Sequence, residues 1–95
     1  MKTPRMRIAV LGAGSISDYH IGGLRAAGAE VAAVFSRDAA KAQAVAQRHG
    51  VTEAVTDWRR LLDDRSLDAV VIATPDFTHE EIAVAAAEAG KPMLL

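Results

Sequence analysis

Two glycines directly follow a short apolar run near the start of the chain. The run is Ile8–Leu11, and Gly12 and Gly14 come next, before a helical pattern that begins at Ile16. Gly12 permits a tight turn that a side chain would obstruct, and Gly14 lets the backbone approach a ligand closely. Free N–H groups at the start of the helix would then point at negative charge. This order of strand, glycine turn and helix is typical of dinucleotide sites and predicts contact with a pyrophosphate.

The next small position of this pattern is Ser17, where glycine or alanine is usual. Serine is still small enough for the helix to pack closely on the strand. Glycine turns also join strands to helices in many α/β proteins, so a purely structural role for this turn stays open.

A second polar group, Ser36 and Arg37, follows the apolar run Val31–Phe35. Sites specific for NAD usually hold an acidic residue about 20 positions past the glycines, bonded to the ribose 2′-hydroxyl. Here no carboxylate would repel a 2′-phosphate, and the Arg37 guanidinium can pair with that phosphate or stack on adenine. The pair therefore favours NADP over NAD. Two alternatives stay open: Arg37 is a solvated residue beside a helix cap, or Asp38 reaches the ribose and the cofactor is NAD.

A third loop, Thr74 to His79, follows the apolar run Leu67–Ala73. Because Pro75 has no N–H group, ligand contacts in this loop would come from carbonyls and side chains. We expect His79 in the first turn of a helix, where it could border a nicotinamide ribose. Support of the loop alone is the alternative role for this histidine.

Composition and the remaining polar residues exclude several other classes of function. The 95 residues include no cysteine, and the net charge of −1 gives no reason to expect nucleic acid or an anionic membrane as a partner. No pair of carboxylates, cluster of histidines or Ser–His arrangement indicates hydrolysis or a metal. His20 and His49 are interpreted as packed and structural. The first apolar run is too short for a signal peptide or a membrane span, so we expect a cytoplasmic protein.

Strand and helix patterns alternate along the whole chain, as expected of one α/β domain. The sequence predicts strands over Ile8–Leu11, Val31–Phe35, Ala54–Val55, Leu67–Ala73 and Pro92–Leu95. It predicts helices over Ser15–Ala27, Ala39–His49, a short segment after Asp57, and a segment from Thr78 to Ala89.

The expected helix boundaries depend on capping residues and glycine stops. Asp38 and Asp57 are predicted N-caps, Gly50 ends the second helix, and Thr78 with Glu81 matches a capping box. The first helix is expected to place one group of residues on its inner side: Ile16, His20, Leu24 and Ala27. The short third helix is expected to turn three residues inward, Trp58, Leu61 and Leu62, and to end no later than the acidic pair that follows.

Right-handed crossovers then predict a doubly wound (Rossmann) parallel sheet of five strands, in the order 3-2-1-4-5, with helices on both faces. Ligands of such sheets lie at the carboxyl ends of the strands. Three loops should therefore converge at one edge: Gly12–Ser17, Ser36–Asp38 and Thr74–His79.

Four segments together resemble the N-terminal domain of the Gfo/Idh/MocA oxidoreductase family. Gly12–His20 is similar to the family's G-x-G-x-I-G/A-x-x-H, and Val34–Asp38 to the end of its second strand, whose Ser-Arg variant is associated with NADP-using members. Leu67–Pro75 with His79 is similar to D-A-V-x-I-A-T-P-x-x-x-H, and Ala89–Leu95 to the A-G-K-x-V-L that precedes the family's Glu-Lys-Pro.

The resemblance implies that residues 1–95 form a dinucleotide-binding Rossmann domain of an oxidoreductase. Such an enzyme transfers a hydride between NAD(P) and a hydroxyl or ketone of a sugar, cyclitol or related substrate. The residues then expected to bind the cofactor are Gly12, Gly14, Ser15, Ile16 and Ser17 at the pyrophosphate, Ser36 and Arg37 at the adenosine ribose, and Ala73, Thr74, Pro75, Asp76 and His79 at the nicotinamide end.

In the family, Glu-Lys-Pro would follow Leu95; its lysine helps catalysis, and a further α+β domain supplies the substrate pocket. Neither lies in these 95 residues. We therefore expect a truncated chain that binds the cofactor without turnover and has no catalytic residue or metal ligand of its own. A naturally short protein is the alternative.

Three further hypotheses stay open. A non-catalytic nucleotide sensor or a scaffold fragment would keep the fold without the chemistry. A methyltransferase would use the glycine turn for S-adenosylmethionine, although Ser36 and Arg37 count against it because an acidic residue normally holds those ribose hydroxyls. Self-association into a homo-oligomer is also expected, either through the exposed edge of the last strand or through the surface that the missing domain would cover.

Overall fold

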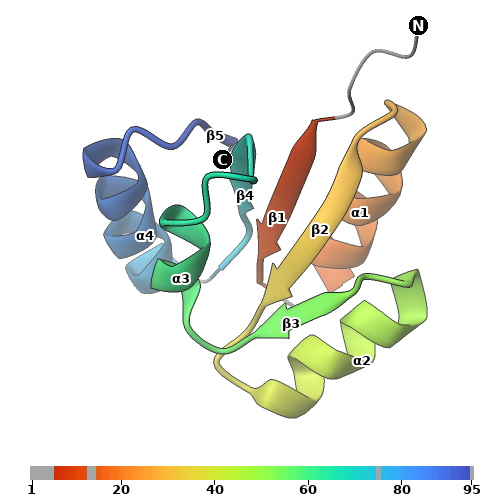
Figure 1. Cartoon of the computed structure of the whole chain (residues 1–95). Coiled ribbons are helices and arrows are strands. Elements are labelled where there is room, and N and C mark those ends of the chain that lie inside the picture. The colour runs from red at the N-terminus through yellow and green to blue at the C-terminus, as the bar shows by residue number, and fades with distance from the viewer. Residues whose placement is uncertain (1–5, 13–14, 75, 95) are drawn as a thin grey trace, which may run out of the picture.

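Each apolar run of the sequence forms a strand in the computed structural model, and each segment between two strands forms a helix (Figure 1). The structure describes residues 6–12, 15–74 and 76–94. In chain order the elements are β1 (Arg7–Leu11), α1 (Ser15–Ala26), β2 (Glu30–Phe35), α2 (Ala39–His49), β3 (Glu53–Val55), α3 (Trp58–Leu62), β4 (Ala69–Ile72), α4 (Asp76–Glu88) and β5 (Met93–Leu94). None of the helices in these residues has the length and apolar character needed to cross a membrane.

The sheet is parallel throughout, with the strand order β3-β2-β1-β4-β5. β1 is central: Val10 pairs with Val34 of β2 on one side and with Val71 of β4 on the other. This arrangement confirms the predicted parallel α/β class and the order of the four strands β3-β2-β1-β4. The fifth strand is present only as a two-residue pairing of β5 with Val70 and Val71.

Each face of the sheet carries its own apolar layer, because successive side chains of a strand point to opposite faces. Figure 1 shows α1 and α2 over one face and α3 and α4 over the other. The first layer includes Ile8, Val10, Ile21, Val34 and Val45. The second includes Leu11, Phe35, Trp58, Leu61 and Ile82. Burial on both faces explains why the central strands are continuous apolar runs.

The caps predicted for α2 are confirmed, and they fix where that helix begins and ends. The Asp38 carboxylate accepts hydrogen bonds from the amides of Ala40 and Lys41 at 2.9 and 3.3 Å. Gly50 ends the helix with a φ of 65°, a conformation that costs a glycine little. The N-terminal end of α2 is therefore held just behind the loop that begins at Ser36.

The short helix α3 also follows its prediction. The Asp57 carboxylate accepts a hydrogen bond from the Arg59 amide at 3.0 Å, as an N-cap should. Trp58, Leu61 and Leu62 are buried, and the helix ends at Leu62, before the acidic pair. α3 thereby covers the end of the sheet face that α4 leaves open.

The inner face predicted for α1 was partly wrong. Leu24 packs against the apolar layer as predicted, together with the buried Ser17 and Ile21. His20 is only half-buried, Ala27 is exposed beyond the end of the helix, and the side chain of Ile16 lies outside the described part of the structure.

The capping box predicted at Thr78 and Glu81 was also wrong. α4 already begins at Asp76, so Thr78 lies within the helix. Its side chain is only 3% exposed and heads a buried stripe with Ile82 and Ala86, four and eight residues further on. The spacing of a capping box also occurs inside a helix whose buried face includes a threonine.

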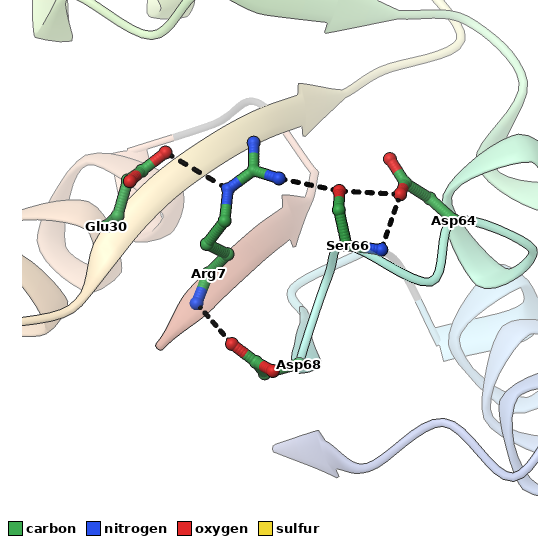
Figure 2. A network of polar contacts seen from close by, with 5 residues as sticks. All are labelled: Arg7, Glu30, Asp64, Ser66 and Asp68. Carbon is green, nitrogen blue, oxygen red and sulfur yellow. Dashed lines mark hydrogen bonds and ion pairs between the residues drawn. The ribbon is translucent and has the colours of Figure 1, made fainter. Parts of the chain in front are cut away.

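A network of polar contacts ties β1, β2 and the loop before β4 together at the amino ends of the strands (Figure 2). The Arg7 side chain donates to Glu30 Oε2 at 3.2 Å and to Ser66 Oγ at 2.6 Å, and its main-chain amide donates to Asp68 Oδ2 at 2.7 Å. Ser66 in turn donates to Asp64 through its amide and its hydroxyl, which lowers the pKa of the Asp64 carboxyl. The polar groups at this end of the sheet are thus occupied in holding strands together.

Lys91 supports the same loop from the opposite side. Its Nζ donates to the carbonyl oxygens of Asp64 and Leu67 at 2.8 and 2.7 Å. The turn before β5 is therefore fastened to the turn before β4.

We predict that Gly22→Ala stabilises the domain. Gly22 lies inside α1, and a Cβ built there meets no atom of the described chain within 4 Å. Alanine in a helix interior is favoured over glycine by about 1 kcal/mol, so the free energy of unfolding in urea should rise by about that amount. Gly28→Ala is the matched control and should destabilise, because Gly28 has a φ of 91°. A loss of stability in Gly22→Ala would contradict the prediction.

Candidate dinucleotide-binding site

Three strands end together at one edge of the sheet. The Gly12 amide, just past β1, donates to the Phe35 carbonyl at the end of β2 at 2.9 Å, and the Ala73 amide donates to the Leu11 carbonyl at 2.8 Å. The arrows of β1 and β2 in Figure 1 point to this edge. The loops that follow β1, β2 and β4 therefore start side by side, as the sequence predicted.

Gly12 lies at the closest contact of this edge. Its φ is 134°, and a Cβ added to it would lie 2.6 Å from the carbonyl oxygen and 2.9 Å from the carbonyl carbon of Ala73. Both the conformation and the space therefore require glycine. The tight turn predicted at this position is confirmed, and the structure adds that the group a side chain would strike is the backbone after β4.

The start of α1 follows this turn directly. Gly14 lies outside the described residues, Ser15 is the first residue of the helix, and Ile16 follows it. Ser17 is 1% exposed, which confirms that its small side chain packs inside. This first turn lies at the carboxyl edge of the sheet, where the helix dipole favours an anion. Contact of Gly14, Ser15, Ile16 or Ser17 with a pyrophosphate stays a prediction.

The loop after β2 is held by hydrogen bonds of its own. The Ser36 amide donates to the Val55 carbonyl at 3.2 Å, and the Ser36 hydroxyl oxygen accepts from the Asp38 amide at 3.1 Å. Arg37 is exposed between them. Asp38 Oδ1 accepts both bonds from the amides of α2, so the cap engages one of the two carboxylate oxygens.

The loop after β4 includes a polar atom that has no partner in the described part of the chain. Ala73 and Thr74 are half-buried, and Thr74 Oγ1 is fully buried with no hydrogen-bond partner among the residues that the structure describes. Such atoms usually pair with water or a ligand. Pro75 lies outside the described residues; Asp76 begins α4, and His79 is half-buried in its first turn, as predicted.

A charged cluster joins the first turns of α1 to the end of α2. Arg48 Nη2 lies 2.8 and 3.0 Å from the two carboxylate oxygens of Asp18, and His49 Nε2 lies 2.7 Å from Asp18 Oδ1. These bonds, that of Arg48 first, hold the pKa of the Asp18 carboxyl below its ordinary value. Asp18 lies near the N-terminus of α1, and Arg48 and His49 lie near the C-terminus of α2. These are the helix ends at which the helix dipole favours acidic and basic side chains.

His49 was predicted to be structural, and this contact confirms it. The role of Asp18 and Arg48 was not predicted. The available signal was an acidic residue in the first turn of one helix and two basic residues in the last turn of the next. In the described part of the chain, no three acidic, histidine or cysteine residues lie close enough together to hold a metal ion.

A parallel sheet whose central strand leads through a glycine at positive φ into a helix defines the class of Rossmann dinucleotide-binding domains. The family model for the oxidoreductase family with an NAD-binding Rossmann fold, GFO_IDH_MocA, matches residues 6–95. The chain belongs to this family.

Curated relatives of known activity are similar over nearly the whole chain. The chain is 43% identical over 95 aligned positions to an inositol 2-dehydrogenase of Saccharopolyspora erythraea, covering 94% of the chain and 27% of that protein. It is 39% identical over 87 positions to a 4-carboxy-2-hydroxymuconate-6-semialdehyde dehydrogenase of a Sphingobium species, covering 90% of the chain and 28% of that protein. The chain thus spans little more than a quarter of the length of these relatives.

Solved structures include relatives with either cofactor. Levoglucosan dehydrogenase in complex with NADH and levoglucosan matches at a TM-score of 0.87 and 30% identity, over 95% of this chain and 27% of that one. A 3-ketoreductase from Actinomadura kijaniata in complex with NADP and TDP-benzene matches at 0.84 and 30%, over 95% and 29%. The fold of this chain is therefore that of an NAD(P)-binding domain. These structures do not distinguish NAD from NADP as its cofactor.

We predict that Gly12→Ala destabilises the domain strongly. The added Cβ would force the turn after β1 away from Ala73 and would hold alanine at an unfavourable φ. Overpacking and backbone strain together should lower the free energy of unfolding in urea by roughly 2 kcal/mol or more. Gly23→Ala is the control, because its Cβ meets no described atom within 4 Å. A loss below about 0.5 kcal/mol in Gly12→Ala would contradict the close contact.

The lowered pKa of Asp18 predicts a dependence of stability on pH. Because its folded-state pKa lies below its unfolded value, the stability that Asp18 contributes is present above the unfolded pKa, about 3.9, and is lost as pH falls through the folded pKa. Wild type should therefore exceed Asp18→Asn in free energy of unfolding at about pH 6, and the difference should shrink progressively below about pH 4. Unfolding in urea at a series of pH values measures this. A difference that stays constant down to about pH 2 would contradict the assignment.

Proposed function

We propose that this chain is the cofactor-binding part of an oxidoreductase that transfers a hydride between NAD(P) and a hydroxyl or ketone of a sugar, cyclitol or related compound. The relatives support the substrate class, since their names include inositol and levoglucosan dehydrogenases. Because the chain covers about a quarter of their length, the reaction is proposed for the longer protein, with the residues described here supplying the cofactor site.

The observation that carries the proposal is the geometry at Gly12. Its positive φ and its contact with Ala73 bring the ends of β1 and β4 together, directly before the amino end of α1. In the proposed complex the pyrophosphate lies on this turn, where it accepts from main-chain amides. The residues assigned to it are Gly12, Gly14, Ser15, Ile16 and Ser17.

We propose that Ser36 and Arg37 select NADP over NAD. Ser36 is half-buried and fixed by its bonds to Val55 and Asp38, so the hydroxyl lies at a defined place. Arg37 follows it on the surface, where a guanidinium can pair with a 2′-phosphate.

We assign the loop after β4 to the nicotinamide end of the cofactor. The residues are Ala73, Thr74, Pro75, Asp76 and His79. The buried hydroxyl of Thr74, which has no partner in the described chain, supports a contact in this region, because binding would supply the missing hydrogen bond. No catalytic role is assigned to these residues, and we expect binding without turnover from the 95 residues by themselves.

Self-association through the outer edge of β5 stays a prediction. β5 lies at the end of the sheet formed by the described residues, and Met93 is half-buried there. Its two-residue length makes it a weak template for pairing.

Calorimetric titration of the chain with NADP, NAD and S-adenosylmethionine, each separately, tests the proposal. We expect NADP to bind more tightly than NAD, and no heat from S-adenosylmethionine. Loss of a charge-assisted contact costs about 1.5–3 kcal/mol, so the double variant Ser36→Asp with Arg37→Ala should weaken NADP at least about tenfold and favour NAD. Arg60→Ala, which removes an exposed charge on α3, is the control and should leave both affinities unchanged.

The three possible failures have different meanings. Preference for NAD in the wild type would overturn the role of Arg37 and keep the cofactor domain. Binding of S-adenosylmethionine in place of either dinucleotide would overturn the assignment of the chain to an oxidoreductase. If none of the three ligands binds, the proposal that these residues form a complete site by themselves is contradicted.

A further inference from the structure

Asp18 connects α1 and α2, the two helices on one face of the sheet, through hydrogen bonds with basic side chains. Arg48 and His49 both reach it from the last turn of α2, and three bonds of 2.7 to 3.0 Å converge on its two oxygens. The Asp18 and His49 side chains are 35% and 22% exposed, so the cluster is partly sheltered from water. Arg48, at 54%, closes it on the outside.

The positions of these residues relate two parts of the candidate site. α1 begins at the turn assigned to the pyrophosphate, and Asp18 is three residues past its first residue. α2 begins behind the loop assigned to the adenosine ribose, and Asp38 caps it. An 11-residue helix is about 16 Å long, so fixing its far end at Asp18 fixes the direction in which its near end presents Ser36 and Arg37.

The apolar contacts of α1 and α2 with the sheet orient these helices less specifically than the charged cluster does. Ile21 of α1 and Val45 of α2 pack into a layer on the same face of the sheet. The side chains that α2 buries are small, Ala42, Val45 and Ala46, and apolar contacts of this kind have little directional character. The hydrogen bonds from Arg48 and His49 to Asp18 add a directional contact at the far end of the helix.

We propose that Asp18 is a positioning residue that holds the pyrophosphate part and the ribose part of the dinucleotide site at the separation the cofactor needs. The inference rests on the proposed function, since it assumes that a dinucleotide binds along this edge. A ligand that contacts both parts gains from their preorganisation, whereas a ligand that contacts only one part does not.

Removing the charge of Asp18 would also act on phosphate binding directly, and this electrostatic effect must be distinguished from a loss of positioning. Asp18 is an anion near an anion site, so removing it would strengthen phosphate binding if only charge mattered. Removing Arg48 and His49 would then weaken it. Loss of position, in contrast, weakens binding of the spanning ligand whichever side of the cluster is removed.

The experiment compares NADP, which spans both parts, with 2′-AMP, which reaches only the ribose part. Calorimetric titrations are run on wild type, on Asp18→Asn, and on the double variant Arg48→Gln with His49→Gln, at a temperature at which circular dichroism shows each to be folded. Partly exposed ion pairs contribute modestly, so the Kd for NADP should rise roughly three- to fivefold in both variants. The Kd for 2′-AMP should change less than about twofold.

Glu30→Gln is the matched control. It breaks an exposed ion pair of similar kind with Arg7, at the opposite end of the sheet, and should change neither Kd. Opposite shifts of NADP affinity in the two cluster variants would show a charge effect and overturn the proposal. Equal losses for NADP and 2′-AMP would show general loosening of the fold and overturn it too, as would an unchanged Kd for NADP. Failure of the proposed function itself is distinguishable, because it would already show as absence of NADP binding in wild type.

Discussion

The close approach of Gly12 to the Ala73 carbonyl is the constraint on which the candidate site depends. A Cβ at position 12 would come within 2.6 Å of that oxygen, so β1 and β4 can end side by side only with glycine there. The same residue hydrogen-bonds to the end of β2, and α1 begins three residues later. Gly12 therefore determines how closely the ends of β1, β2 and β4 and the start of α1 come together.

The two ends of the sheet use their polar groups differently. At the amino ends, Arg7, Ser66 and Asp64 satisfy one another and join strands that lie far apart in sequence (Figure 2). At the carboxyl ends, a buried Thr74 hydroxyl has no partner in the described chain. The first arrangement holds the sheet together, and the second leaves a hydrogen bond for water or a ligand to supply.

Local signals predicted much of the fold and part of the site. The bounds of α2 were predicted because Asp38 and Gly50 each have a strong preference for one helix end. The inner face of α1 was partly misplaced because alanine, glycine and serine give a weak periodic pattern, and the start of α4 because the Thr78–Glu81 spacing fits a helix interior equally well. The bond from Asp18 to Arg48 and the contact of Gly12 with Ala73 join residues distant in sequence, and no local pattern specifies which distant residue will be the neighbour.

Binding of a dinucleotide at the carboxyl edge of the sheet can be followed through the backbone amide signals of the ¹⁵N-labelled chain by NMR during titration with NADP. We expect the amides of Gly12, Ser36 and Thr74 to shift, together with those of the first turn of α1. The amides of Arg7, Glu30 and Ser66, at the other end of the strands, should stay in place. Shifts gathered at the amino ends, or spread evenly over the sheet, would contradict the site described here.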